Sequence, residues 1–175
     1  TLDNKRLAFT DVVPETSGKN RYPWGIAKKQ VSEFLVAHPE ERDNILHPRT
    51  VVRTTNKQNL AKDLQVLARY PVLDTLHPGL KNQLTSLQTK QDKALYAVPY
   101  SVANAERILK IYDELWLASD AIRNTDSDFS DYLKNRARDL LSDDYESGDA
   151  SWISGDFGNI NAQIGSYETY DDALF

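Results

Sequence analysis

The stretch that decides the fold runs from Ser101 to Leu141, "SVANAERILKIYDELWLASDAIRNTDSDFSDYLKNRARDLL". Apolar residues recur in it at the spacing of two amphipathic helices. The first run holds Val102, Ala105, Ile108, Leu109, Tyr112, Leu115, Trp116 and Ile122, and the second holds Phe129, Tyr132, Leu133, Ala137, Leu140 and Leu141. Ser101 is the expected N-cap of the first helix, and Asp126, Ser127 and Asp128 favour the start of the second. Because the connection is short, we expect an antiparallel helical hairpin.

Shorter elements are expected on both sides of this hairpin. The patterns predict helices over 26–37, 58–69 and around Leu80 to Leu87, and strands over 50–54 and 94–100. After the hairpin, 142–158 reads as a docked loop and 159–175 as a strand. The predicted class is α+β, predominantly helical with a few short strands. Residues 1–24 form an irregular lead-in, and 25–175 form one incomplete domain.

Composition excludes several classes of function. Hydrophobic residues make up 40% and charged residues 27%, as in a soluble globular chain. The net charge of -5 and the lack of a basic cluster argue against a nucleic-acid partner. No apolar run is long enough to cross a membrane, so no membrane partner is expected. Cysteine is absent, which excludes disulfides and thiolate-ligated zinc within these residues. Whether the protein is cytoplasmic or exported stays open.

Each of the three histidines precedes a proline, as His38-Pro39, His47-Pro48 and His77-Pro78. Imidazole is a common zinc ligand, but no two of them have the spacing that places both on one helix face. We therefore interpret them as residues that end helices and start loops.

Two well-known hydrolase motifs are also missing. The sequence contains no His-Glu-x-x-His helix and no Gly-x-Ser-x-Gly elbow. Five acids gather in the predicted loop after the hairpin, but they lack the calcium-loop spacing, so solvated or capping roles are expected. These acids are Asp143, Asp144, Glu146, Asp149 and Asp156. A calcium-dependent module remains the weakest of the alternatives.

Glu168 and Tyr170 form a different kind of candidate site. On a strand, residues two apart share a face, so the carboxylate and the phenol would point into the same space. Such a pair can bind a cationic amine and donate a hydrogen bond to a carbonyl oxygen. An ordinary strand with polar residues outward is the competing interpretation.

Four segments, in order, favour the functional interpretation. They are "YPWGIAKKQVSEFLVAHPEERDNILHPRTVVR", "LYAVPYSVANAERILKIYDELWLASDAI", "YLKNRARDLLSDDYESGDASWI" and "INAQIGSYETYDDALF". Together they resemble the bacterial branch of the dipeptidyl-peptidase III family of zinc metallopeptidases. The similarity covers 22–175, is poor over 57–93, and is most specific in "AVPYS", "RA…LLSDDY" and the segment around "YETY". Ser166 departs from the proline that bacterial relatives often have there.

The resemblance implies a two-lobed fold around a cleft and a zinc ion that this chain does not ligate. It implies that Glu168 holds the free N-terminal ammonium of a peptide substrate and that Tyr170 hydrogen-bonds the scissile carbonyl as it becomes tetrahedral. We therefore expect this chain to be the N-terminal part of an enzyme that removes dipeptides. Its partners would be the peptide substrate and the remainder of its own polypeptide, and alone it would be catalytically silent. The alternative is a non-catalytic peptide-binding or scaffold protein that kept the cleft without the metal.

Overall fold

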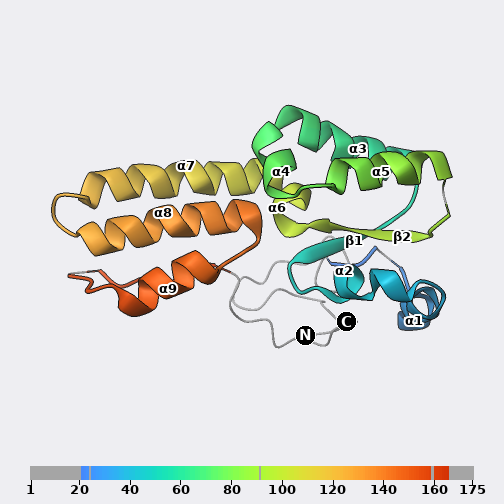
Figure 1. Cartoon of the computed structure of the whole chain (residues 1–175), viewed down its shortest axis with the longest axis horizontal. Helices are drawn as coiled ribbons and strands as arrows, with labels where there is room; N and C mark the ends of the chain where they lie inside the picture. The colour runs from blue at the N-terminus through green and yellow to red at the C-terminus, as the bar shows by residue number, and fades with distance from the viewer. Residues whose placement is uncertain (1–20, 24, 91, 159, 166–175) are drawn as a thin grey trace. The chain divides into compact units, whose positions relative to one another are not determined.

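The computed structural model describes residues 21–23, 25–90, 92–158 and 160–165, and these fall into two compact units. The described elements are α1 (Lys28–Ala37), a 3-10 turn (Pro39–Glu41), α2 (Arg42–Leu46), β1 (Thr50–Thr54), α3 (Lys57–Arg69), α4 (Pro71–Leu76), α5 (Leu80–Lys90), β2 (Leu95–Pro99), α6 (Tyr100–Ala103), α7 (Ala105–Ile122), α8 (Ser127–Ser142) and α9 (Glu146–Ser154). The chain is mainly helical with one antiparallel strand pair in its described part, which confirms the predicted class (Figure 1).

The first unit is built on the β1–β2 ribbon, in which Val52 lies opposite Ala97. Because side chains alternate along a strand, Val52, Leu95 and Ala97 share one face. Apolar residues of α1 and α2 cover that face and form a core with it. The core comprises Tyr22, Val31, Phe34, Leu35, Ile45, Val52, Leu95 and Ala97. The opposite face carries Tyr96, whose ring is 1% exposed.

The second unit is organised around α8, which contacts α4, α6, α7 and α9. Figure 1 shows α7, α8 and α9 as stacked helices, with α8 between the other two. The buried side of α8 is wide because it packs against both α7 and α9. Its buried residues are Phe129, Ser130, Tyr132, Leu133, Arg136, Ala137, Asp139, Leu140 and Leu141. The predicted antiparallel hairpin of α7 and α8 is confirmed.

The first helix of the hairpin differs from its prediction at its start. A single helix capped by Ser101 was expected, but α6 ends at Ala103 and α7 begins at Ala105. Asn104 adopts a non-helical conformation between them, and its side chain donates to the Tyr100 carbonyl at 3.1 Å. Ser101 therefore lies inside α6 and is not an N-cap.

Three further helices, α2, α4 and α9, were not predicted as such. Pro71 follows the predicted helix 58–69 and is the first residue of α4, where its missing N–H leaves no intrahelical hydrogen bond unmade. Glu146–Ser154, expected as loop, forms α9. The segment 160–165 contains no strand, although one was predicted there, and the rest of that prediction, 166–175, lies outside the described residues.

Candidate functional site

The predicted pair Glu168 and Tyr170 lies outside the described residues. The structure does describe the segment that leads to it. The Gly158 amide donates to Asp126 Oδ2 at 2.8 Å, and the Asp156 amide donates to Asp128 Oδ2 at 2.9 Å. Both carboxylates belong to the start of α8, where negative charge is favoured. The Asp126 side chain also accepts from the Phe129 amide at 2.9 Å, so its predicted capping role is confirmed.

Aromatic contacts hold the same segment against α8. The Phe157 ring lies 5.3 Å from the Phe129 ring and 5.7 Å from the Tyr132 ring. Further along, the Ile164 amide donates to the Tyr132 hydroxyl at 2.9 Å. The expectation that aromatics dock this region is confirmed, although part of the docked segment is helical.

Helix α9 is held by its only glycine, Gly148. The Gly148 amide donates to Asp139 Oδ2 at 2.9 Å across the α8–α9 interface. A Cβ at this position would lie 2.2 Å from Asp139 Oδ2 and 2.7 Å from Arg136 Cζ. Only glycine therefore allows α9 to approach α8 this closely. This segment has no apolar stripe from which the helix could be predicted, because its docking depends on a polar contact.

Below Gly148 lies a buried guanidinium. Arg136 has no exposed surface, and its Nη2 donates to Asp149 Oδ1 at 2.7 Å. Its Nη1 lies 3.3 Å from Asp139 Oδ2, and the Tyr132 and Tyr145 rings lie on its faces at 5.4 and 5.2 Å. Burial raises the pKa of Asp139 to about 6, although Arg136 opposes the shift. This network joins α8 to α9 and explains why an arginine is tolerated in the core.

The five acids considered for calcium separate into different roles. Asp149 pairs with Arg136, Asp144 accepts from the Glu146 amide at 3.2 Å, and Asp143 accepts from Ser101. The described ranges contain no group of three or more residues placed to hold a metal ion. The described residues therefore offer no ligand set for the zinc that the resemblance implies, and no chemical step is assigned to a metal here.

Asp143 is the centre of a polar cluster that the sequence did not predict. Its Oδ2 accepts from the Ser101 amide at 3.0 Å and from the Ser101 hydroxyl at 2.7 Å. The His77 Nε2 lies 2.8 Å from the Ser101 Oγ and 3.0 Å from the Leu141 carbonyl oxygen. Asp143 also adopts a left-handed conformation, with φ of 58°, as the C-cap of α8. The cluster thus joins the end of α4, the start of α6 and the end of α8.

A serine, a histidine and an aspartate in contact invite comparison with a catalytic triad, but the connections differ. In a triad the aspartate orients the histidine and the histidine activates the serine. Here the Asp143 carboxylate accepts directly from the Ser101 hydroxyl, and Ser101 has no exposed surface. Burial also lowers the pKa of His77. The geometry is that of a buried structural clasp, which we call the Ser101–Asp143 clasp.

The histidines confirm the interpretation of His-Pro pairs as helix punctuation. His38, His47 and His77 are the C-cap residues of α1, α2 and α4. Burial and the positive charges of Arg49 and Arg21 lower the pKa of His47. The clasp is the one additional role that the His-Pro pattern did not indicate.

The first unit contains a buried carboxylate of its own. Asp63 of α3 is 1% exposed, and its Oδ2 accepts from the Tyr96 hydroxyl at 2.8 Å. Arg53 Nε lies 3.0 Å from the same oxygen. Burial raises the pKa of Asp63 in spite of Arg53, and burial beside Asp63 also raises the pKa of Tyr96. This group ties α3 to the ribbon.

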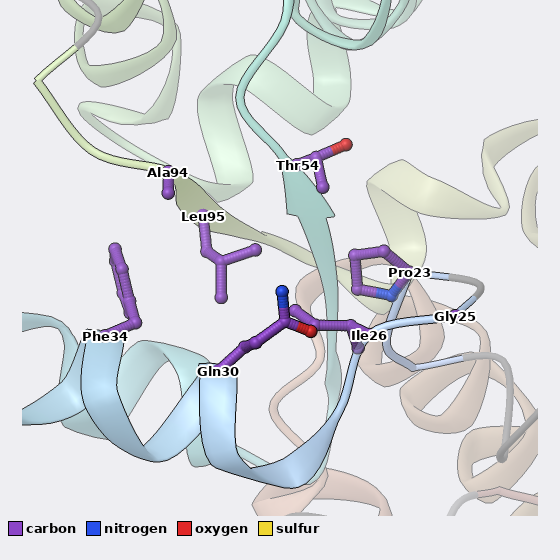
Figure 2. Close-up of a pocket in the computed structure, with 8 residues that line it drawn as sticks. All are labelled: Pro23, Gly25, Ile26, Gln30, Phe34, Thr54, Ala94 and Leu95. Carbon is purple, nitrogen blue, oxygen red and sulfur yellow. The ribbon is translucent and has the colours of Figure 1, made fainter.

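A pocket of about 300 Å³ lies on the other side of the ribbon, between α1 and the strand ends. Figure 2 shows the side chains that surround it. They are Pro23, Gly25, Ile26, Gln30, Phe34, Thr54, Ala94 and Leu95. Sequence reasoning missed this pocket, because its residues are spread over four segments and none has a chemical signature.

Comparison with known proteins gave no relatives: no family model, no curated protein and no solved structure matches this chain. Among the described residues, no helix is both long enough and apolar enough to cross a bilayer.

Proposed function

We propose that this chain is the N-terminal part of a zinc-dependent peptidase of the dipeptidyl-peptidase III type. The observation that carries the proposal is the ordered resemblance of four segments, ending in "INAQIGSYETYDDALF". In this proposal Glu168 and Tyr170 act on the peptide. Zinc, held by residues that this sequence does not contain, would supply the Lewis acid.

The roles of the two residues follow from their chemistry. The Glu168 carboxylate accepts charge-assisted hydrogen bonds from the free ammonium of the substrate, which fixes where the peptide starts. The Tyr170 hydroxyl donates to the scissile carbonyl oxygen as negative charge develops on it. An amine anchor and an oxyanion donor on one strand would select a bond at a set distance from the N-terminus.

The contacts between the most specific segments support the proposal. "AVPYS" contributes Ser101, "RA…LLSDDY" contributes Arg136 and Asp143, and Asp139 lies between the two halves of the second motif. Ser101 and Asp143 bind each other in the clasp, and Arg136 and Asp139 hold α9. Ser101, Arg136 and Asp143 therefore all have structural roles in the second unit.

The test uses the natural protein that contains this chain, with its zinc content measured, and dipeptidyl-naphthylamide substrates. We expect Glu168→Gln to raise KM and Tyr170→Phe to lower kcat by about 10²-fold, the loss typical of one oxyanion donor. Thr169→Ser lies between the two and serves as the matched control with unchanged kinetics.

Blocking the substrate amine distinguishes the roles further. An N-acetylated dipeptide substrate should be cleaved far more slowly, because Glu168 then has no ammonium to bind. A zinc-loaded protein that hydrolyses none of these substrates would overturn the proposal. If that protein still bound free-amine peptides through Glu168, the non-catalytic peptide-binding alternative would replace it.

A further inference from the structure

The residues that line the pocket beside the ribbon limit the classes of ligand that it can bind. The eight described residues that line it are uncharged, and most present carbon atoms. Phe34 and Leu95, whose side chains face the space in Figure 2, are also part of the core of the first unit. A phosphate, a carboxylate or a metal ion would find no opposite charge in such walls, so the pocket suits an uncharged apolar group.

The size of the pocket suits a small apolar group better than a large cofactor. About 300 Å³ lies at the lower end of the range for ligand sites, which is too small for most cofactors. A buried aromatic or large aliphatic side chain would fill such a space and gain the corresponding apolar burial. The walls are also fixed, because Phe34 and Leu95 are 7% and 4% exposed and packed among core residues.

Gln30 adds one directed polar group to the rim. Its Oε1 accepts from the Ala27 amide at 2.8 Å, at the first turn of α1. Since this bond fixes the amide orientation, the side-chain nitrogen is directed the other way, toward the strand ends in Figure 2. It is therefore a held donor next to an apolar space.

We propose that this pocket binds a neutral aromatic or large aliphatic side chain of a peptide, with the Gln30 amide nitrogen donating to the peptide carbonyl beside that side chain. An apolar pocket with one directed donor is the usual form of a side-chain recognition site. The inference goes beyond the proposed function, because it concerns residues of the first unit and requires neither Glu168 nor Tyr170.

The experiment titrates this chain with N-acetyl-phenylalaninamide and follows amide signals by two-dimensional NMR. We expect saturable shifts of the Gln30 side-chain amide and of the Phe34 and Leu95 backbone amides. N-acetyl-aspartamide, which carries a charged side chain, should produce none of them. Affinity should be weak, with a dissociation constant of about 1 mM, because one side chain supplies the apolar contact.

Two variants and a control make the test specific. Ala94→Leu places a larger side chain at the pocket and should abolish the shifts. Ala61→Leu makes the same change at an exposed site of α3 away from the pocket and should leave them intact. Gln30→Met removes the donor at similar size and should weaken binding by about threefold to tenfold.

The readout does not depend on catalysis, so failure of the peptidase proposal leaves it unaffected. Absence of saturable shifts, equal shifts with N-acetyl-aspartamide, or binding by Ala94→Leu equal to the unmodified chain would each overturn the inference. Equal unfolding midpoints of Ala94→Leu and Ala61→Leu would show that lost binding is not lost folding.

Discussion

The pKa of a carboxylate in this chain depends on burial as much as on neighbouring charges. Asp139 lies beside a guanidinium, which would favour its ionised form, yet burial raises its pKa to about 6 from an ordinary value of 3.8. Asp126, at the partly exposed start of α8, instead accepts hydrogen bonds from the backbone amides of Phe129 and Gly158. The capping role of Asp126 could be predicted because it depends on neighbours in sequence. The partners of Asp143 could not, because Ser101 is 42 residues away.

The raised pKa of Asp139 makes stability depend on pH in a defined direction. A folded-state pKa above the unfolded one means that the folded chain binds more protons between about pH 4 and pH 6. The contribution of Asp139 is therefore greatest below pH 4 and declines as the pH rises to about 6. We expect urea denaturation of the unmodified chain, relative to Asp139→Asn, to show this decline.

Carboxyl NMR provides the direct measurement, with a midpoint near pH 6 for the Asp139 carbon that is missing in Asp139→Asn. A midpoint near the ordinary value of 3.8 would contradict the prediction. The comparison with the asparagine variant is needed because His77 acts in the opposite direction. Its lowered pKa gives stability that is lost as the pH falls below about 6.5.

At the scale of elements, the α7–α8 hairpin depends on two small residues close to its turn, Ser119 and Ser130. The Ser119 hydroxyl donates to the Ser130 carbonyl at 2.9 Å, and the two hydroxyl oxygens lie 2.8 Å apart. Neither serine has any exposed surface. Small side chains allow the helix backbones to approach, and the mutual hydrogen bonds satisfy the polar groups that this approach buries.

Leucine substitutions at two adjacent positions of α7 should show different effects on stability, because one position is buried and the other is exposed. Ser119→Leu overfills the contact and leaves Ser130 without its partner, so we expect a loss of about 2–4 kcal/mol of unfolding free energy. Ala118→Leu introduces the same side chain on the exposed face and should change it by less than about 0.5 kcal/mol. Urea denaturation followed by circular dichroism measures both, and similar losses in the two variants would refute the packing account.

Which helices could be predicted depends on what holds them. α7 and α8 bury apolar stripes, and these are visible as periodicity. α9 docks through Gly148 and Arg136, and α4 begins at a proline that also follows another helix. A helix that docks through polar contacts has no periodic apolar pattern in its sequence. A proline after a helix can mark either the end of that helix or the start of the next one, so Pro71 alone does not predict α4. The break at Asn104 is equally invisible, since the apolar spacing continues across it.

At the scale of the whole molecule, each compact unit is assembled from segments that are not consecutive in the sequence. The chain leaves the first unit within α3, returns at Leu80 and leaves again after Pro99. One incomplete domain from 25 onward stays a prediction, because two compact units can belong to the same domain. Grouping into units depends on contacts between distant segments, such as Tyr96 with Asp63, that local patterns do not contain.

The separate cores predict independent effects on stability. Asp63→Ala removes the carboxylate that Arg53 and Tyr96 share, and should cost about 3–5 kcal/mol because it leaves the half-buried cation uncompensated. Ser119 shares no partner with this group. We therefore expect the double variant with Ser119→Leu to equal the sum of the single variants within about 0.5 kcal/mol. A larger coupling in a double-mutant cycle would show that the two cores respond as one.

The Ser101–Asp143 clasp has a consequence for the timescale of folding. Ser101 and Asp143 are 42 residues apart in the sequence. Closing a chain segment of that length costs conformational entropy that two hydrogen bonds alone only partly offset. Once α7 and α8 have paired, however, their outer ends already lie together, and the clasp closes over a short remaining gap. It should thus form after the rate-limiting step. Its removal would hardly slow folding but would accelerate unfolding, so this one carboxylate governs how long the native state lasts more than how quickly it is reached.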